Sequence, residues 1–274
     1  MDPIAKTAYY CCGVRMLDAQ SARPICNDQL AERFMDGPAR ALFARFAHFR
    51  GPNSSNAARH RMIDDLLRER LAANPALRVV LIGAGFDTRA FRMQGGSWYE
   101  LDQPALLARK EELLPQHSAP NRLVRIPIEF GRDSLLERLG PAAGDGPTVT
   151  VLEGVSMYLT REQLRATTAV LRDLFPDHTL ITDLMTRRFL ARYGQALRRR
   201  IRELGGDMAE LFDDPVEVVA SLGYRRRASW SIPGRALEHE GRRFPIWLLN
   251  HVFPSLRDGY QVQVFEGEPN GHGH

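Results

Sequence analysis

Lysine is nearly absent from this chain of 274 residues: of its 37 lysine and arginine residues, only Lys6 and Lys110 are lysines, which leaves 35 arginines. So strong a skew is typical of base-composition bias in a genome. The arginines lie along the whole chain among acidic residues, and the densest run, residues 198–202, has no interleaved aromatic residue. Proteins that bind nucleic acids combine clustered basic charge with stacking aromatics. Although the isoelectric point is about 9.2, we therefore expect no nucleic-acid partner.

Cysteine and long apolar segments are also scarce. The three cysteines, Cys11, Cys12 and Cys26, are an odd number without a nearby histidine cluster, which predicts reduced thiols and neither a disulfide framework nor a metal site. The apolar runs, such as residues 79–82, are far too short to span a bilayer, and the N-terminal residues show no secretory pattern. These absences predict a cytoplasmic protein with no membrane partner.

Hydrophobic residues make up 44% of the chain, an ordinary fraction for a globular protein, and the length suits one large domain. Residues 1–75 are predicted to form helices, an N-terminal cap of that domain, with a loop at residues 51–55. From residue 76 to 268, short β-branched runs alternate with helical segments, which predicts an α/β fold with a mostly parallel sheet. We expect strands at residues 78–82, 97–101, 123–128, 148–152, 179–183, 224–231 and 261–266.

A charged helical stretch at about residues 186–215 is much longer than the connection that a compact α/β unit needs. We interpret it as a lid or substrate-binding insertion. Ligands of open α/β sheets bind beyond the carboxyl ends of the strands, where such an insertion would cover them. The polar residues 269–274 are predicted to form a disordered tail.

The sequence Gly83-Ala84-Gly85 directly follows the first predicted strand and precedes a helix that begins near Thr88. The two glycines would allow a ligand to lie against the backbone, where a Cβ atom would collide with it. Asp87 or Thr88 can cap the helix. A dinucleotide-binding fingerprint has a third glycine at the position of Thr88. Its absence, and the roughly 75 residues before the first strand, weigh against an NAD(P)-dependent oxidoreductase, which stays an alternative.

Acidic residues follow two further predicted strands. Glu100 and Asp102 lie 17 and 19 residues after Gly83, at the end of the second strand. An acid there can accept hydrogen bonds from both hydroxyls of an adenosine ribose, but side-chain alternation along a strand does not choose between the two. Glu153 follows another buried strand and would lie above the same cleft. Since a buried carboxylate is costly alone, we expect Glu153 to have a partner.

Three stretches of the sequence, residues 81–89, 100–104 and 153–159, resemble the leucine carboxyl methyltransferase and polyketide O-methyltransferase family of class I S-adenosylmethionine-dependent enzymes. Residues 24–33 and 59–65 support the resemblance, which runs from about residue 6 to 183 and is weaker beyond. It implies a Rossmann-like seven-stranded sheet, mostly parallel with an antiparallel last strand. It also implies that S-adenosylmethionine is the cofactor and S-adenosylhomocysteine the product.

The resemblance assigns roles to residues of the cofactor site. Arg59 would bind the methionine carboxylate of the cofactor, because a guanidinium group can hold a carboxylate through two parallel hydrogen bonds. Arg61 is the second candidate for that role. The turn at residues 83–85 would pass under the amino-acid part of the cofactor. Asp102 would accept the ribose hydroxyls, and Glu153 would face the ammonium or homocysteine side.

The resemblance implies further cofactor contacts at both ends of the site. Lys6 falls where similar enzymes place a basic residue near the cofactor and the acceptor. At residues 129 and 130, similar enzymes more often have Asp before an apolar residue, and the pair grips the adenine amine. This chain has Glu129 and then Phe130, and the extra methylene lengthens the reach by roughly 1.5 Å.

Candidates to contact the acceptor follow the strand that carries Glu153. Tyr158 is our candidate catalytic residue. Arg187, Arg188 and Arg192 open the predicted insertion together with Tyr193, and they could clamp an anionic substrate.

No general base stands out, because His178, His239 and His251 are scattered along the chain. A carboxylate acceptor is already ionised near neutral pH, whereas a phenol or alcohol usually needs a base. We therefore expect O-methylation of a natural-product-like small molecule, a carboxylate or a hydroxyl, with a slight preference for the carboxylate. A protein or peptide C-terminus is an alternative acceptor. The enzyme would act as a monomer or homodimer.

Overall fold

The computed structural model describes residues 3–144, 146–209, 211–239, 247 and 251–267. The tail predicted at residues 269–274 lies outside this described part. Among the described residues, no helix combines the length and the apolar character that crossing a lipid bilayer requires. All three cysteines are free thiols, as the sequence predicts.

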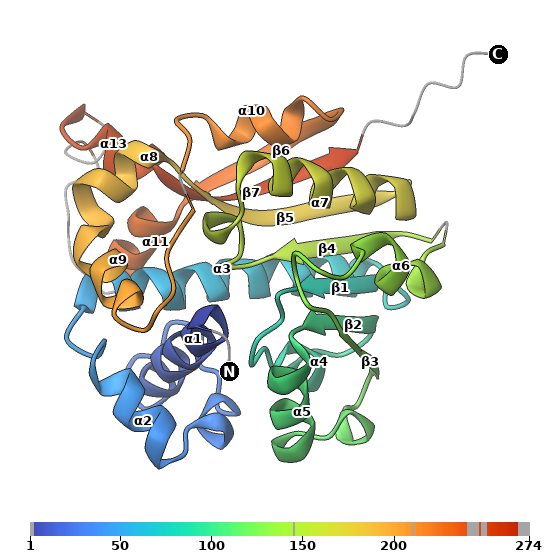
Figure 1. Cartoon of the computed structure of the whole chain (residues 1–274), viewed down its shortest axis with the longest axis horizontal. Helices are drawn as coiled ribbons and strands as arrows, with labels where there is room; N and C mark the ends of the chain where they lie inside the picture. Colours follow the sequence, from blue (N-terminus) through green and yellow to red (C-terminus); the bar gives the residue numbers. More distant parts are fainter. Residues whose placement is uncertain (1–2, 145, 210, 240–246, 248–250, 268–274) are drawn as a thin grey trace.

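A seven-stranded sheet forms the centre of the molecule (Figure 1). Its strands lie in the order β3-β2-β1-β4-β5-β7-β6, and β7 runs antiparallel to both of its neighbours while the other pairs are parallel. The predicted fold class is therefore confirmed, the antiparallel last strand included. The strands are β1 (Arg78–Ile82), β2 (Ser97–Asp102), β3 (Arg122–Pro127), β4 (Thr148–Leu152), β5 (His178–Met185), β6 (Tyr224–Ser231) and β7 (Tyr260–Gly267).

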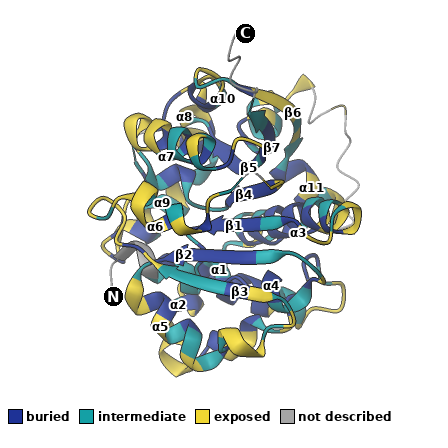
Figure 2. Ribbon diagram, turned by 90° about the vertical axis from the view of Figure 1, so that its right-hand side faces the viewer, coloured by how far each residue is buried: buried dark blue, intermediate teal, exposed yellow. Residues whose placement is uncertain are grey.

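Helices cover both faces of the sheet, with α3 and α11 on one side and α7 on the other (Figure 2). The described helices are α1 (Pro3–Ala19), α2 (Gly37–Ala44), α3 (Arg50–Ala73), α4 (Arg89–Arg92), α5 (Pro104–Leu113), α6 (Leu135–Leu139), α7 (Arg161–Leu174), α8 (Arg187–Phe189), α9 (Gln195–Arg202), α10 (Pro215–Ala220), α11 (Ile232–His239) and α13 (Pro254–Asp258). Short 3-10 turns join several of them, and a π-helical turn at Leu190–Gly194 links α8 to α9.

The apolar residues of the central strands explain these layers. In β1, Val79 and Leu81 belong to the core beneath α1 and α3, whereas Val80 and Ile82 belong to the core beneath α7 and α10. Successive side chains of a strand point to opposite faces, so a strand that is apolar at every position is stable only between two layers. The β-branched run that marks β1 in the sequence thus places the following glycine turn at a sheet edge with helices on both sides.

The predicted loop at residues 51–55 is wrong, because α3 begins at Arg50 and includes all five of these residues. Gly51 and Pro52 suggested a break in the chain, but Pro52 lies in the first turn of α3. There its missing N–H would have no intrahelical partner in any case. As a result, Ser54, Ser55 and Asn56 project from a helix toward a cavity, and do not belong to a loop.

The stretch predicted as an insertion at residues 186–215 contains α8, the π-helical turn and α9, followed by an irregular segment that reaches α10. Phe189, Leu190 and Ile201 are buried on its inner side. These apolar residues belong to the same hydrophobic core as the buried residues of α3. Together with the start of α3, the stretch lines a cavity.

Candidate functional site

Two adjoining cavities lie beyond the carboxyl ends of the parallel strands. The larger, of about 500 Å³, follows β1, β2 and β4, and the smaller, of about 300 Å³, lies between the start of α3 and the helices that follow β5. Five residues line both cavities and therefore mark the junction between them: Thr7, Cys11, Arg59, Gly154 and Tyr158.

The predicted glycine turn lines the larger cavity. Gly83 has φ +70° and Gly85 has φ +48°, values in the left-handed region that glycine adopts most readily. A Cβ atom on Gly83 would lie 2.4 Å from Cγ2 of Val155, so the collision that glycine avoids here is with the protein itself. Gly83 and Gly85 both line the cavity, so the prediction that a ligand lies against this turn stays a prediction. Ala84, between the two glycines, also lines the cavity.

The structure distinguishes Asp102 from Glu100, which the sequence could not. Both side chains lie on the same face of β2, because they are two residues apart. Glu100 is fully buried below the cavity and pairs with Lys110 at 2.8 Å and with Arg125 at 3.1 Å. Asp102 ends the strand and lines the larger cavity, where each of its oxygens accepts a backbone N–H at 2.7 Å, from Gly85 and Gln103. Asp102 is therefore the carboxylate available to a ligand.

Burial raises the pKa of Asp102, whereas the two backbone N–H groups partly offset that rise. A carboxylate oxygen has two lone pairs, and each oxygen of Asp102 uses one of them for a backbone N–H. Both oxygens can thus accept a further hydrogen bond from the cavity side.

Arg59 lies at the junction of the cavities, in a network of buried charges. Its Nε donates to Glu153 at 3.2 Å, and its Nη1 donates to Asp183 at 3.2 Å and to the Tyr260 hydroxyl at 2.6 Å. No described residue accepts a hydrogen bond from its Nη2, which lies 3.0 Å from where a Cβ of Gly154 would be. Arg61, the second candidate, points outward and pairs with an exposed aspartate.

Glu153 has the partners that the sequence led us to expect. Beside Arg59, the fully buried Arg89 pairs with it at 2.8 Å, and His60 Nδ1 lies 3.3 Å from it. The cations beside it, Arg89 foremost, hold the pKa of Glu153 well below its usual range despite burial. Glu153 is therefore a carboxylate, and it lines the larger cavity as predicted.

Three groups in this network have the spacing of a metal site, since ligand atoms of His60, Asp87 and Glu153 lie within 4.8 Å of one another. The guanidinium group of Arg89 occupies the space among them. Its Nη1 is 2.6 Å from Asp87 and 2.8 Å from Glu153, and its Nη2 is 2.8 Å from His60 Nδ1. This donor set fits a buried arginine and not a metal ion.

Of the two predicted adenine contacts, one lines the larger cavity and the other lies outside it. Phe130 lines the larger cavity and is 40% exposed. Glu129 does not line it, because its side chain turns outward to pair with Arg132 at 2.9 Å. Asp133, which the sequence analysis did not single out, lines the cavity instead. Lys6 lines neither cavity, although its neighbour Thr7 lines both.

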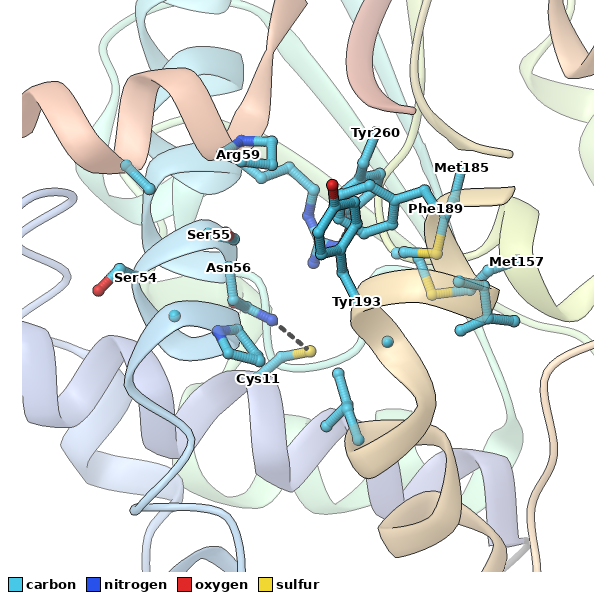
Figure 3. A pocket seen from close by; sticks show the side chains of 18 of the residues that line it. Cys11, Ser54, Ser55, Asn56, Arg59, Met157, Met185, Phe189, Tyr193 and Tyr260 are labelled. Atoms are coloured by element: carbon cyan, nitrogen blue, oxygen red, sulfur yellow. Dashed lines mark hydrogen bonds between the residues drawn. The ribbon is translucent and has the colours of Figure 1, made fainter. Parts of the chain in front are cut away.

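The smaller cavity is mostly apolar. Arg59, Tyr260, Phe189 and Tyr193 lie together on one wall, and Asn56 donates to Cys11 on another (Figure 3). Its other apolar lining residues include Met157, Met185, Leu190, Leu197, Ile201 and Met208.

The predicted acceptor contacts lie partly in this cavity. Tyr158 lines both cavities, and burial raises the pKa of its phenol. Of the four residues expected to clamp an anionic substrate, Tyr193 lines the smaller cavity, whereas Arg187, Arg188 and Arg192 are exposed and line neither.

Sequence reasoning missed the residues that support Arg59 and Glu153. Arg89 and Asp183 carried a usable signal, since one follows the glycine turn and the other ends a predicted strand. Tyr260 carried none, because it lies 201 residues from Arg59 and begins the last strand.

The strand order and the position of the cavities define a Rossmann-like protein with two cavities beyond the carboxyl ends of its parallel strands. The family profile described as leucine carboxyl methyltransferase matches residues 8–172, and the chain therefore belongs to the leucine carboxyl methyltransferase family.

Individual relatives agree with this membership. A Mycobacterium tuberculosis protein named "Putative S-adenosyl-L-methionine-dependent methyltransferase" is 32% identical over 180 residues, which cover 57% of this chain and 57% of that protein. A Streptomyces coelicolor protein of the same description is 34% identical over 148 residues, covering 52% of this chain and 47% of that one. The chain thus spans about half the length of the curated relatives it matches.

Two solved structures share the fold at low sequence identity. A Thermobifida fusca protein described as "a putative methyltransferase" has a TM-score of 0.56 at 15% identity, and the match covers 90% of this chain and 100% of that one. Magnesium protoporphyrin IX methyltransferase from Synechocystis, solved with bound S-adenosylhomocysteine, has a TM-score of 0.50 at 13% identity, with 88% and 100% covered.

Proposed function

We propose that this protein is an S-adenosylmethionine-dependent methyltransferase that acts on an oxygen of a small, largely apolar molecule. The observation that carries the proposal is the pair of adjoining cavities, one with polar groups suited to the cofactor and one with an apolar lining. Membership of the leucine carboxyl methyltransferase family and the names of the relatives support the cofactor. A cytoplasmic location is part of the proposal.

The residues of the larger cavity fit the cofactor. The free lone pairs of Asp102 suit the two ribose hydroxyls, and Phe130 offers an apolar surface for the adenine. The Nη2 group of Arg59 has no described partner, and the absence of a side chain on Gly154 leaves it accessible to the carboxylate of the cofactor. Glu153 is ionised and would face the ammonium group.

When bound, S-adenosylmethionine supplies an electrophilic methyl group. The chain contributes position: the junction residues Arg59, Gly154 and Tyr158 would bring an acceptor oxygen in line with that methyl group. Holding two reactants in a near-attack geometry can lower a barrier by roughly 7–11 kcal/mol. The mostly apolar lining of the smaller cavity would keep water away from the reacting atoms.

The size of the smaller cavity supports a small acceptor. At about 300 Å³ it lies at the lower end of ligand pockets, which span roughly 300–1,000 Å³. Its lining is mostly apolar, and the arginines once expected to clamp an anion are outside it. A compact molecule with few charges fits this cavity best.

Isothermal titration calorimetry with S-adenosylhomocysteine tests the cofactor site. We expect Asp102→Ala to weaken binding by about 10- to 100-fold, because hydrogen bonds to a charged group contribute about 1.5–3 kcal/mol. Glu129→Ala is the matched control, since this acid lies outside the cavity, and its affinity should stay within about twofold of wild type. Circular dichroism would show that both variants are folded.

Undiminished affinity of Asp102→Ala would overturn the site. Tighter binding of NAD than of S-adenosylmethionine to the wild-type protein would favour an oxidoreductase. Transfer of a radiolabelled methyl group to a panel of carboxylic acids and phenols would then test the activity.

A further inference from the structure

The phenol of Tyr260 lines the smaller cavity next to the junction residue Arg59, and it belongs to a closed triangle of buried polar groups. Its hydroxyl donates to Oδ2 of Asp183 at 2.7 Å and accepts from Nη1 of Arg59 at 2.6 Å. The same Arg59 nitrogen is 3.2 Å from Asp183 Oδ2. Tyr260 lines the smaller cavity beside Arg59 (Figure 3). Two hydrogen bonds thus fix the hydroxyl of a residue that lines the smaller cavity, which we propose as the acceptor site.

The hydrogen-bonding capacity of this hydroxyl shows what could bind there. A tyrosine hydroxyl has one proton to donate and two lone pairs that can accept. The proton is used for Asp183 and one lone pair for Arg59, so one lone pair remains. A ligand can satisfy it only by donating, as an O–H group does and a carboxylate does not.

Asp183 is suited to receive a proton through Tyr260. Its side chain is fully buried, and its other oxygen, Oδ1, accepts the backbone N–H of Gly154 at 2.7 Å. The carboxylate therefore has no exposure to solvent, and the Tyr260 hydroxyl connects it to the cavity. Burial raises the pKa of Tyr260 well above its usual value, so the group is a neutral phenol at rest.

We propose that the acceptor is a hydroxyl compound and that its proton leaves through Tyr260 to Asp183. As the acceptor oxygen forms its bond to the methyl group and the bond from that methyl to sulfur breaks, the acceptor O–H bond breaks. Tyr260 takes this proton and passes its own to Asp183, which becomes neutral as the sulfonium charge disappears. The inference rests on the proposed methyltransferase function and replaces the carboxylate preference drawn from the sequence, which could not locate a base.

We call this proton transfer, from the acceptor through Tyr260 to Asp183, the relay. The acidity of the acceptor decides how much the relay contributes to the rate of methyl transfer. A weakly acidic phenol depends on a base while the methyl group arrives, and such catalysis typically contributes about 10²- to 10⁴-fold. A phenol that is already ionised at the assay pH has no proton to lose. Loss of the relay should therefore lower the rate of methyl transfer to weakly acidic phenols much more than to acidic ones.

The test measures methyl transfer by Tyr260→Phe and wild type with phenol, 4-cyanophenol and 4-nitrophenol, in order of rising acidity. We expect the wild-type rate to exceed that of Tyr260→Phe by about 100-fold or more for phenol. The ratio should fall steadily along the series and be smallest for 4-nitrophenol above its pKa. Asp183→Asn, which keeps Tyr260 but removes the proton acceptor, should show the same dependence on acidity.

Tyr193→Phe is the matched control. It removes another phenol of the same cavity, whose hydroxyl lies 3.2 Å from Ser255. We expect a single modest factor for all three phenols, because Tyr193 has no contact with Asp183 among the described residues.

Each other outcome decides against the relay in its own way. An equal loss for all three phenols in Tyr260→Phe, or an equal loss of affinity for S-adenosylhomocysteine, would mean that Tyr260 only positions Arg59. A wild-type protein that binds S-adenosylhomocysteine but methylates carboxylic acids and no phenol would overturn the relay and leave the methyltransferase function standing. A wild-type protein that does not bind S-adenosylhomocysteine would overturn the function itself.

Discussion

The two cavities differ in which part of the chain builds them. Every residue that lines the larger cavity lies between Thr7 and Val170, almost the same span as the family match at residues 8–172. The smaller cavity takes about half of its lining from residues 185–260, beyond that match. The family match therefore informs us about the larger cavity, and the structure alone informs us about half of the smaller one.

The two sides also differ in how they are held together. Beneath the larger cavity lie buried ion pairs that connect α1, α3, α4 and β4, with Arg89 and Asp64 fully buried among them. The smaller cavity is enclosed mainly by apolar contacts of α8, α9 and α11. Apolar walls tolerate substitution more readily than a network of charges whose members must all be paired. We therefore expect the walls of the smaller cavity to tolerate substitution better than the charge network beneath the larger one.

The largest expected effect is the removal of Arg89. Arg89→Ala leaves the carboxylates of Asp64, Asp87 and Glu153 without their common cation, and breaking a buried pair typically costs about 3–5 kcal/mol. Urea denaturation would measure this loss. Arg61→Ala, which removes an exposed pair with Asp65, should cost less than about 1 kcal/mol. Equal losses in the two variants would contradict the contrast between buried and exposed charge.

Low pH should destabilise the protein through the same network of buried charges. The pKa values of Asp64 and Glu153 are lowered from ordinary values of 3.8 and 4.5, through nearby His60 and arginines, Arg89 foremost for Glu153. A carboxylate with a lowered native pKa stabilises the fold above its unfolded pKa, and this stability is lost as pH falls through the native value. Urea midpoints should thus decline most steeply below about pH 4.5. A constant midpoint down to pH 3 would contradict this assignment.

A pair of matched substitutions should separate the two cavities. Leu197→Phe adds bulk to the smaller cavity and should raise the KM of the phenol acceptor about tenfold. Its affinity for S-adenosylhomocysteine should stay within about twofold of wild type. Leu135→Phe adds the same bulk to the larger cavity and should do the reverse. Calorimetry and initial rates would measure both constants. Parallel changes in the two variants would show that the cavities act as one.

The smallest effect is expected on the surface of α9. Arg200 pairs with Glu203 at 2.6 Å, and both side chains are at least one-third exposed. Because solvent screens such pairs, Arg200→Ala should change the free energy of unfolding by less than about 0.5 kcal/mol in urea denaturation. A loss above about 2 kcal/mol would mean that this arginine run is more than a solvated helix face.

Local patterns allowed much of the fold to be predicted. Runs such as residues 78–82 and 148–152 became strands with the expected bounds, because a continuous β-branched segment between helices has few other stable states. The start of α3 was missed, because a proline marks a break in most contexts but is tolerated in the first helical turn. Glu129 and Phe130 illustrate the limit for sites, since adjacent residues that both suited adenine lie on different sides of the cavity wall.

By itself, the sequence determined the layered α/β fold and the glycine turn, because both depend on residues close together in the chain. It also determined that acids would stand at the strand ends. Only the tertiary structure decided which acid faces the cavity and that Arg59 meets Asp183 and Tyr260. The physical reason is distance along the chain: these groups are 124 and 201 residues from Arg59, and no local pattern encodes a contact that only the closing of the sheet creates.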